Sequence, residues 1–228
     1  MSVDEETVFY RPVNPPFERP FKEMSKKELR AYFEWFLSSI SERMKELTAE
    51  VRRTVGYEHW EPDCSPTSLD TLGTWYASQV EQRPLTAEEM AEARAALPEK
   101  YSFLEAELPT ATLTYRSLSL AFDIGVYLSQ VLLRNCDALS WQQVTSGKTY
   151  NDYGQPVLVG LERRRCSPLL LSVVLAEGLA EGTKTAESLC ELYDIWSRKT
   201  LLKVLELACG AARRPRRVFR VRSSLCFS

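Results

Sequence analysis

The sequence contains a single histidine, His59, and its cysteines stand far apart. Structural zinc sites use cysteines and histidines at short, regular spacing, and redox motifs use two cysteines separated by two residues. Neither spacing occurs in this chain. We therefore expect no metal ion and no cofactor. The six cysteines are Cys64, Cys136, Cys166, Cys190, Cys209 and Cys226.

Long apolar runs are also missing. The two most apolar stretches, residues 118–133 and 168–175, are interrupted by polar side chains or are too short, whereas a membrane-spanning helix needs about 20 largely apolar residues. The first ten residues carry acidic side chains where an export signal would have basic residues followed by an apolar run. We therefore expect a soluble cytoplasmic protein with free thiols and no contact with a membrane.

The charges are nearly balanced over the 228 residues, with 29 basic against 31 acidic side chains. This composition excludes a histone-like protein and a disordered chain. Six of the basic residues are arginines in residues 211–228, which hold no acid, so residues 1–210 carry 23 basic against 31 acidic side chains, a net charge of −8. Because residues 1–210 are acidic, they would repel nucleic acid, and nucleic-acid binding by this Arg-rich tail is disfavoured. An edge strand and a solvated terminus are the alternatives, and we favour the solvated terminus.

Helix signals dominate the chain. Ser25 and Glu28 form a capping box before a long stripe of apolar residues at steps of three and four, and Thr86 with Glu89 form another. The segment from 113 to 135 is apolar on two sides, which predicts a helix buried from two directions. Helices are predicted over residues 25–54, 65–80, 86–98, 113–135 and 189–210.

Short runs rich in Val and Leu lie between turn residues in the second half, at 141–145, 155–161 and 169–175, and predict three strands. Residues 11–24 are rich in proline and predict an extended arm laid over the domain. The predicted fold class is therefore α+β, a mainly helical single domain over residues 1–210 with a small antiparallel β-sheet in its second half.

Residues 146–149, Ser-Gly-Lys-Thr, have the ending of a phosphate-binding loop. The pattern also requires a glycine where Gln142 stands and a helix that begins at the lysine. A turn follows instead, so no row of N–H groups would face a phosphate. We interpret this segment as a hairpin turn.

The loop at residues 58–64 gathers an imidazole, three carboxylates and a thiol. His59, Trp60 and Asp63 are candidate binding residues here, and Cys64 could pair with a base. One histidine cannot supply the usual zinc ligands, and a loop does not hold a nucleophile and a base in fixed geometry. We favour a surface loop anchored by Trp60.

A polar stripe runs along the predicted helix at 113–135, formed by Arg116, Asp123, Tyr127 and Gln130, because steps of seven and four return to the same helix face. An acid in so apolar a helix must be solvated or paired, since burying an isolated carboxylate is costly. The structural interpretation is an ion pair or hydrogen bond, for example with Arg116 or Tyr127. The functional alternative is a polar groove that receives a ligand or a basic side chain of a partner protein.

Part of the chain resembles an arrangement found in other proteins. The successive residues 120–128, Leu-Ala-Phe-Asp-Ile-Gly-Val-Tyr-Leu, followed by Trp141 and then residues 152–157, Asp-Tyr-Gly-Gln-Pro-Val, resemble an arrangement that recurs in bacterial cytoplasmic proteins. Some of those proteins resemble immunity proteins of polymorphic toxin systems. The resemblance implies binding to another protein more than catalysis, and it assigns no role to a single residue.

The sequence therefore favours a non-enzymatic protein-binding module, an immunity protein that neutralises a bacterial toxin by docking an acidic surface on it. The expected partner is a basic toxin or effector domain. The alternative is a small-ligand-binding protein or an enzyme that uses a polar groove along the 116–134 helix. We predict no catalytic residue. The candidate binding residues are Arg116, Asp123, Tyr127, Gln130, His59, Trp60, Asp63 and Tyr153.

Overall fold

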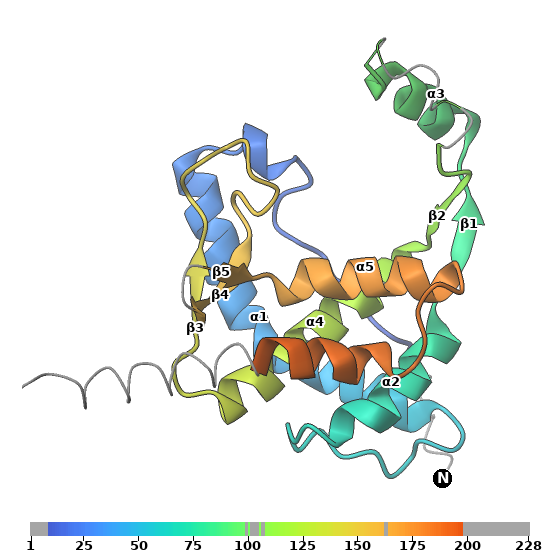
Figure 1. Ribbon diagram of the computed structural model, residues 1–228, viewed down its shortest axis with the longest axis vertical. Helices are drawn as coiled ribbons and strands as arrows, with labels where there is room; N and C mark the ends of the chain where they lie inside the picture. The colour runs from blue at the N-terminus through green and yellow to red at the C-terminus, as the bar shows by residue number, and fades with distance from the viewer. Residues whose placement is uncertain (1–8, 99, 101–104, 106–107, 162–163, 198–228) are drawn as a thin grey trace, which may run out of the picture.

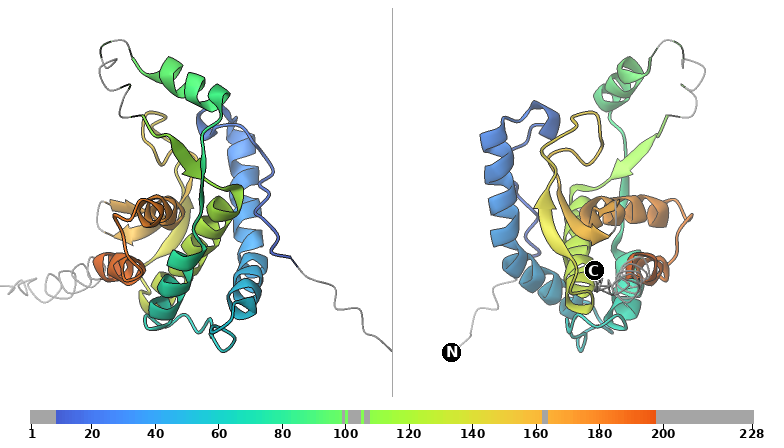
Figure 2. Two further views of the ribbon diagram at one scale, coloured as in Figure 1. Left: turned by 90° about the vertical axis from the view of Figure 1, so that its right-hand side faces the viewer. Right: turned by 60° about the vertical axis from the view of Figure 1, so that its left-hand side comes forward.

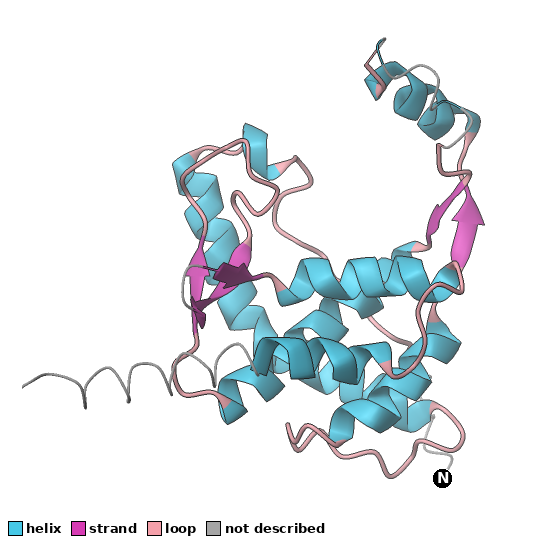
Figure 3. Cartoon of the chain, in the orientation of Figure 1, coloured by secondary structure: helices cyan, strands magenta, loops and turns pink. Residues whose placement is uncertain are grey.

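A computed structural model describes residues 9–98, 100, 105, 108–161 and 164–197. It confirms a mainly helical α+β fold with small antiparallel sheets (Figures 1 and 3). The elements are η1 (Phe21–Glu23), α1 (Lys26–Arg53), α2 (Ser68–Gln79), β1 (Gln82–Pro84), α3 (Ala87–Ala96), β2 (Ala111–Leu113), α4 (Tyr115–Asn135), β3 (Ser140–Gln143), β4 (Pro156–Leu161), β5 (Arg164–Cys166) and α5 (Pro168–Ala180), followed by a helix at residues 188–197.

Helix α1 begins and ends close to the predicted bounds. The Ser25 hydroxyl accepts a hydrogen bond from the Glu28 amide at 3.3 Å, and the Glu28 carboxylate accepts one from the Ser25 amide at 2.8 Å. This capping box satisfies amide groups that the first turn leaves unpaired. The helix then buries one side, including Phe36 and Leu47, against the rest of the protein.

Helix α4 is the centre of the core. Leu120, Ile124 and Leu128 are fully buried, and so are residues on its other side, because α1 packs on one side and α5 on the other. Gly125 lies where α4 meets α5, and a Cβ atom there would come within 2.8 Å of the Leu169 Cα. Helix α4 is therefore buried from two directions, which confirms the prediction made from its two-sided apolar pattern.

Helix α5 contradicts the strand predicted at residues 169–175. The run from 168 to 180 is apolar nearly all round, and Pro168 occupies its first turn, where the missing N–H costs nothing. Short apolar runs do not distinguish a buried strand from a buried helix by periodicity. Here the run is 13 residues long and packs extensively on α4, which leaves it no polar face.

The three-stranded sheet has the order β3-β4-β5, all antiparallel, with Trp141 opposite Leu158. Strands β3 and β4 confirm two of the predicted strands. The sequence did not indicate β5, nor the separate β1–β2 ribbon, because each has only three residues.

Strands β1 and β2 leave the body of the protein, and we name residues 82–113 the α3 arm. The two strands pair in antiparallel register and carry α3 at their far end, which stands clear of the other helices in Figure 1 and in the right-hand view of Figure 2. A second capping box, Thr86 with Glu89, starts α3 as predicted. No residue of α3 is buried.

The proline-rich N-terminal segment is extended over residues 9–20, as predicted, and ends in the short η1 turn. The Val13 amide donates to the Ser119 hydroxyl at 3.2 Å, and the Tyr115 hydroxyl donates to the Val13 carbonyl at 2.6 Å. Arg11 forms an ion pair with Glu46. These contacts fasten the segment across α1 and α4.

The helix at residues 188–197 confirms the described part of the helix predicted at 189–210. The remaining part, the Arg-rich tail at 211–228, Cys209 and Cys226 lie outside the described residues. Four cysteines within them form no disulfide: Cys64, Cys136, Cys166 and Cys190. Of the helices that the structure describes, none has the length and apolarity to cross a membrane.

Candidate functional site

Asp123 lies buried where α1 crosses α4. The Arg43 guanidinium donates from Nε to Oδ1 at 2.7 Å and from Nη2 to Oδ2 at 2.6 Å, and the Tyr10 hydroxyl donates to Oδ2 at 2.7 Å. Burial raises the pKa of Asp123 above its ordinary value, and the hydrogen bonds from Arg43 and Tyr10 oppose that rise. The partners are therefore not Arg116 or Tyr127, which the sequence analysis suggested.

Arg43 could have been identified from the sequence. It occupies a position of the apolar stripe of α1, seven residues after Phe36 and four before Leu47, and only 7% of it is exposed. A charged residue on a buried helix face requires a partner from another element. Sequence alone does not name that partner, because Asp123 is 80 residues away.

Arg116 connects α4 with α1 and with the end of α2. Its Nη2 donates to the Glu50 carboxylate of α1 at 2.7 Å and to the Gln79 side-chain carbonyl at the end of α2 at 3.0 Å. Gln130, further along α4, is half-buried and donates to the Ser129 hydroxyl at 3.3 Å. The two residues thus make separate local contacts.

Tyr127 holds the loop that follows α1. Its hydroxyl lies 2.6 Å from the Ser68 hydroxyl and accepts from the Cys64 amide at 3.2 Å, while its ring packs on Trp60. Burial raises the pKa of Tyr127 to about 12. Cys64 has a φ of 55°, in the left-handed region that non-glycine residues seldom adopt, and the bond to Tyr127 holds it there.

The polar stripe of α4 therefore does not form one site. Asp123 bonds to α1 and the N-terminal segment, Arg116 to α1 and α2, and Tyr127 to the loop before α2. These are the contacts of the structural interpretation, in which buried polar groups determine how helices pack.

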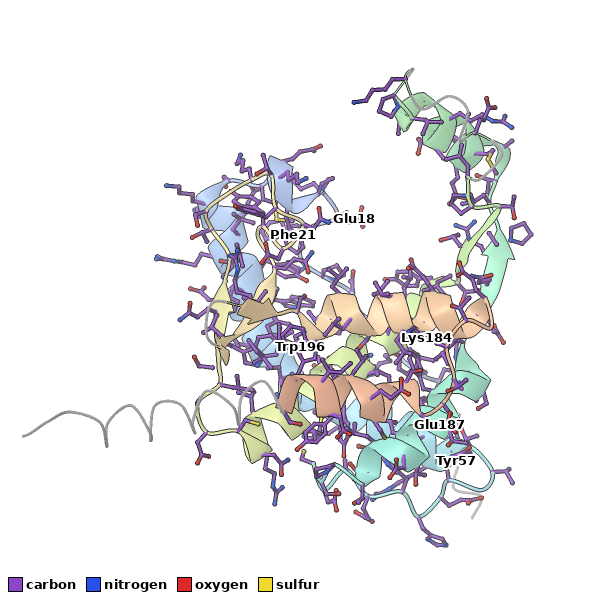
Figure 4. The ribbon with its side chains drawn as sticks, viewed as in Figure 1. Glu18, Phe21, Tyr57, Lys184, Glu187 and Trp196 are labelled. Atoms are coloured by element: carbon purple, nitrogen blue, oxygen red, sulfur yellow. The ribbon has the colours of Figure 1, made fainter. Side chains whose placement is uncertain are left out.

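His59, Trp60 and Asp63 do come together, around a hollow of about 350 Å³ beside α2. Trp60 is buried and donates from its indole to the Ser68 carbonyl at 3.2 Å, so it anchors the loop as predicted. His59 is exposed, and Asp63 accepts from the Ser65 amide at 2.8 Å. Tyr57, labelled in Figure 4, lines the same hollow.

The thiol of the same loop, Cys64, does not line this hollow and is unlike a nucleophile. Burial raises the pKa of the Cys64 thiol, whereas a nucleophilic cysteine needs a lowered pKa. The thiol lies 3.8 Å from the Pro62 carbonyl. Across the described part of the chain, no group of three or more His, Cys, Asp or Glu side chains is placed to hold a metal ion.

Tyr153, the remaining candidate, is buried and packs with Met24 and Leu29. It therefore presents no ring to a partner. The turn before it closes with a hydrogen bond from the Tyr150 amide to the Gly147 carbonyl at 3.0 Å, and no helix follows Lys148. The Ser-Gly-Lys-Thr segment is the hairpin turn that we predicted.

The outer face of α3 was not among the predicted sites. Glu88 and Glu92 are exposed there, one turn apart, with Ala91 beside them. Two other acids of the α3 arm are paired, Glu89 with Arg83 at 2.6 Å and Glu105 with Arg94 at 3.0 Å. The sequence carries no signal for this exposure, because Met90, Ala93 and Leu97 recur at the spacing of a packed helix.

The described surface thus offers an exposed acidic helix face, the hollow beside His59, and a further hollow of about 550 Å³ at the start of α1. Searches with the whole chain found no matching family model, no matching curated protein and no matching solved structure.

Proposed function

We propose that this protein is a non-enzymatic protein-binding module that docks its α3 arm on a basic surface of another protein. The observation that carries the proposal is that α3 is a capped ten-residue helix with no buried residue. Helices this short are marginal in water, and most helical stability in proteins comes from packing a face against other elements. A partner surface would supply the packing that the chain itself does not.

Charge defines the class of partner. From the sequence, residues 82–113 hold six acidic and three basic side chains, a net charge of −3. The basic side chains Arg83 and Arg94 are engaged by Glu89 and Glu105, so Glu88 and Glu92 remain to face outward. A partner with a basic patch would associate faster and be selected over neutral surfaces.

The proposal includes the function that the resemblance implies. A toxin domain that acts on nucleic acid or another anion needs basic side chains around its active site. An acidic helix held away from the body by a two-stranded ribbon could enter such a site and block it. The partner in this proposal is accordingly a basic toxin or effector domain.

The enzymatic alternative has less support. Catalysis needs polar groups that converge on a substrate position. Asp123 and Tyr127 instead form hydrogen bonds with other elements of the fold.

The test is quantitative co-purification of the full chain from its source cells, with a matched pair of double variants. The variant E88K/E92K reverses the charge of the outer face of α3. The control E177K/E181K reverses the charge of two exposed glutamates with the same spacing at the end of α5. We expect the wild-type chain and E177K/E181K to capture one stoichiometric basic protein, and E88K/E92K to capture at least tenfold less. Added salt at about 0.3 M should weaken capture, because screening shortens the range of charge attraction.

Equal capture by E88K/E92K would contradict the role of the arm. Recovery of no stoichiometric partner by any of the three proteins would contradict the function itself. If the captured protein is toxic when expressed alone, co-expression with the wild-type chain should restore growth, and co-expression with E88K/E92K should not.

A further inference from the structure

We propose that the corner where α1 begins is a binding site for a phosphorylated small molecule of nucleotide size. The site is a hollow of about 550 Å³ lined by side chains of α1 and of the connection that leaves β3. Ligand pockets in proteins commonly measure about 300–1,000 Å³. The lining residues are Lys26, Lys27, Arg30, Phe33, Gln143 and Thr145.

The charge of the hollow is uncompensated. Lys26, Lys27 and Arg30 line it, and within the described part of the chain none of the three forms an ion pair. The nearest acid in sequence, Glu28, is occupied by the capping box and lies 3.5 Å from Arg19. Three cations therefore share one hollow in a body whose residues 1–210 have a net charge of −8.

The position of these cations is unfavourable for the helix. Lys26 and Lys27 are the first two residues of α1, at the positive end of the helix dipole. A cation there is less favourable than a neutral residue, and acids are preferred. Departures from such local rules without compensation inside the chain are typical of functional sites. An anionic ligand would supply the compensation.

The other lining groups indicate the kind of anion. Arg30 can bind two phosphate oxygens at once, and the lysines add point charges. The half-buried ring of Phe33 offers an apolar wall against which a base can stack, which inorganic phosphate would not need. The Gln143 side-chain amide donates to the Leu29 and Gly154 carbonyls, which fixes its orientation and leaves its carbonyl oxygen to accept from a ligand.

Lys148 of the Ser-Gly-Lys-Thr turn does not belong to the site. Its ammonium group donates to the Lys22 carbonyl at 3.3 Å and lies 5.8 Å from the Tyr153 ring. Phe21, labelled in Figure 4, packs beside the same turn at Gly154. These contacts hold the turn against η1, away from the residues that line the hollow.

Isothermal titration of the full chain with ATP, AMP, pyrophosphate and adenosine tests the proposal. We expect ATP to bind more tightly than AMP, and adenosine to bind at least tenfold more weakly than either. The variant K26A/R30A should weaken ATP binding at least tenfold. The control K45A/K184A removes two exposed lysines elsewhere and should leave ATP binding unchanged.

A third variant, F33L, separates a nucleotide site from a simple anion site. We expect F33L to weaken ATP several-fold and to leave pyrophosphate unchanged. Circular dichroism should show that each variant keeps its helix content, because alanine and leucine favour helices.

Three outcomes would overturn the site: no binding of any probe at millimolar concentration, equal losses in K26A/R30A and K45A/K184A, or ATP bound no more tightly than pyrophosphate and insensitive to F33L. The result is independent of the protein partner. The arm variant E88K/E92K should bind ATP like the wild-type chain, so the two proposals can fail separately.

Discussion

Arg43 on α1 and Asp123 on α4 form a buried, two-pronged ion pair with N···O distances of 2.7 and 2.6 Å. Their side chains are 8% and 0% exposed. The Tyr10 hydroxyl shares the same carboxylate, and the Arg11 carbonyl accepts from the Arg43 Nη1 at 2.8 Å. One ion pair thus joins two helices and the N-terminal segment.

Removing one member of this pair should be far more damaging than removing both. A single R43A or D123A leaves a buried charge without its partner and should cost about 3–5 kcal/mol of unfolding free energy. The double variant R43M/D123L replaces the pair with apolar groups of similar volume and should cost less than either single change. Urea denaturation measures all three.

The exposed pair Arg94–Glu105 serves as the control, and R94A should cost less than about 1 kcal/mol. A double variant R43M/D123L that is less stable than both single variants would contradict this prediction.

Gly125 should tolerate no larger residue, although alanine favours helices. A Cβ atom there would lie 2.8 Å from the Leu169 Cα and 2.9 Å from the Pro168 carbonyl oxygen, so G125A must push α4 and α5 apart. Overpacking of this kind costs about 1–3 kcal/mol. Thermal denaturation should show a clear loss for G125A, and an unchanged Tm would contradict this close approach of the two helices.

Alkaline pH should destabilise the protein above pH 10. Burial raises the pKa of both Tyr32 and Tyr127 to about 12, from an ordinary value of 10 in the unfolded chain. Between pH 10 and 12 the unfolded state therefore releases protons that the folded state keeps, and stability falls as pH rises. Tyrosinate absorbance in the folded protein should show tyrosines that ionise well above pH 10, and Y32F should remove one of them. Ionisation of both tyrosines near pH 10 while the protein remains folded would contradict this assignment.

Cys190 should react slowly with iodoacetamide at pH 8.5. Burial, followed by its hydrogen bond to the Asp70 carboxylate at 2.9 Å, raises the pKa of its thiol to about 12. The thiolate is the reactive form, so few molecules are reactive at that pH. D70N removes the negative charge, which lowers the pKa of the thiol, and should accelerate alkylation up to roughly tenfold for each unit by which that pKa falls. Peptide mass spectrometry follows the site, with the Cys64 rate as the internal reference that D70N should not change.

Local signals predicted much of the helical framework. The capping boxes at Ser25 and Thr86 position the starts of α1 and α3, because the box is formed by residues three apart that meet in any helix. The two-sided apolar pattern of α4 predicted its central place. Trp60 was correctly expected to anchor its loop, since a large indole in a short polar loop needs a surface to cover.

The strand predicted at 169–175 was wrong because a run with no polar face has no periodicity to interpret, and its contacts with α4 decided the conformation. The projecting α3 arm was likewise missed, because sequence reports that a helix forms but not whether anything packs on it.

By itself the sequence determined most of the helices and their caps, the β3–β4 hairpin and the acidic balance of the body, since all of these depend on neighbours along the chain or on composition. Only the tertiary structure decided that Asp123 bonds to Arg43 and Tyr10, that Gln143 and Thr145 complete a hollow with the cations of α1, and that α3 stands free. The first two join residues far apart in the chain, and all three depend on how the elements pack.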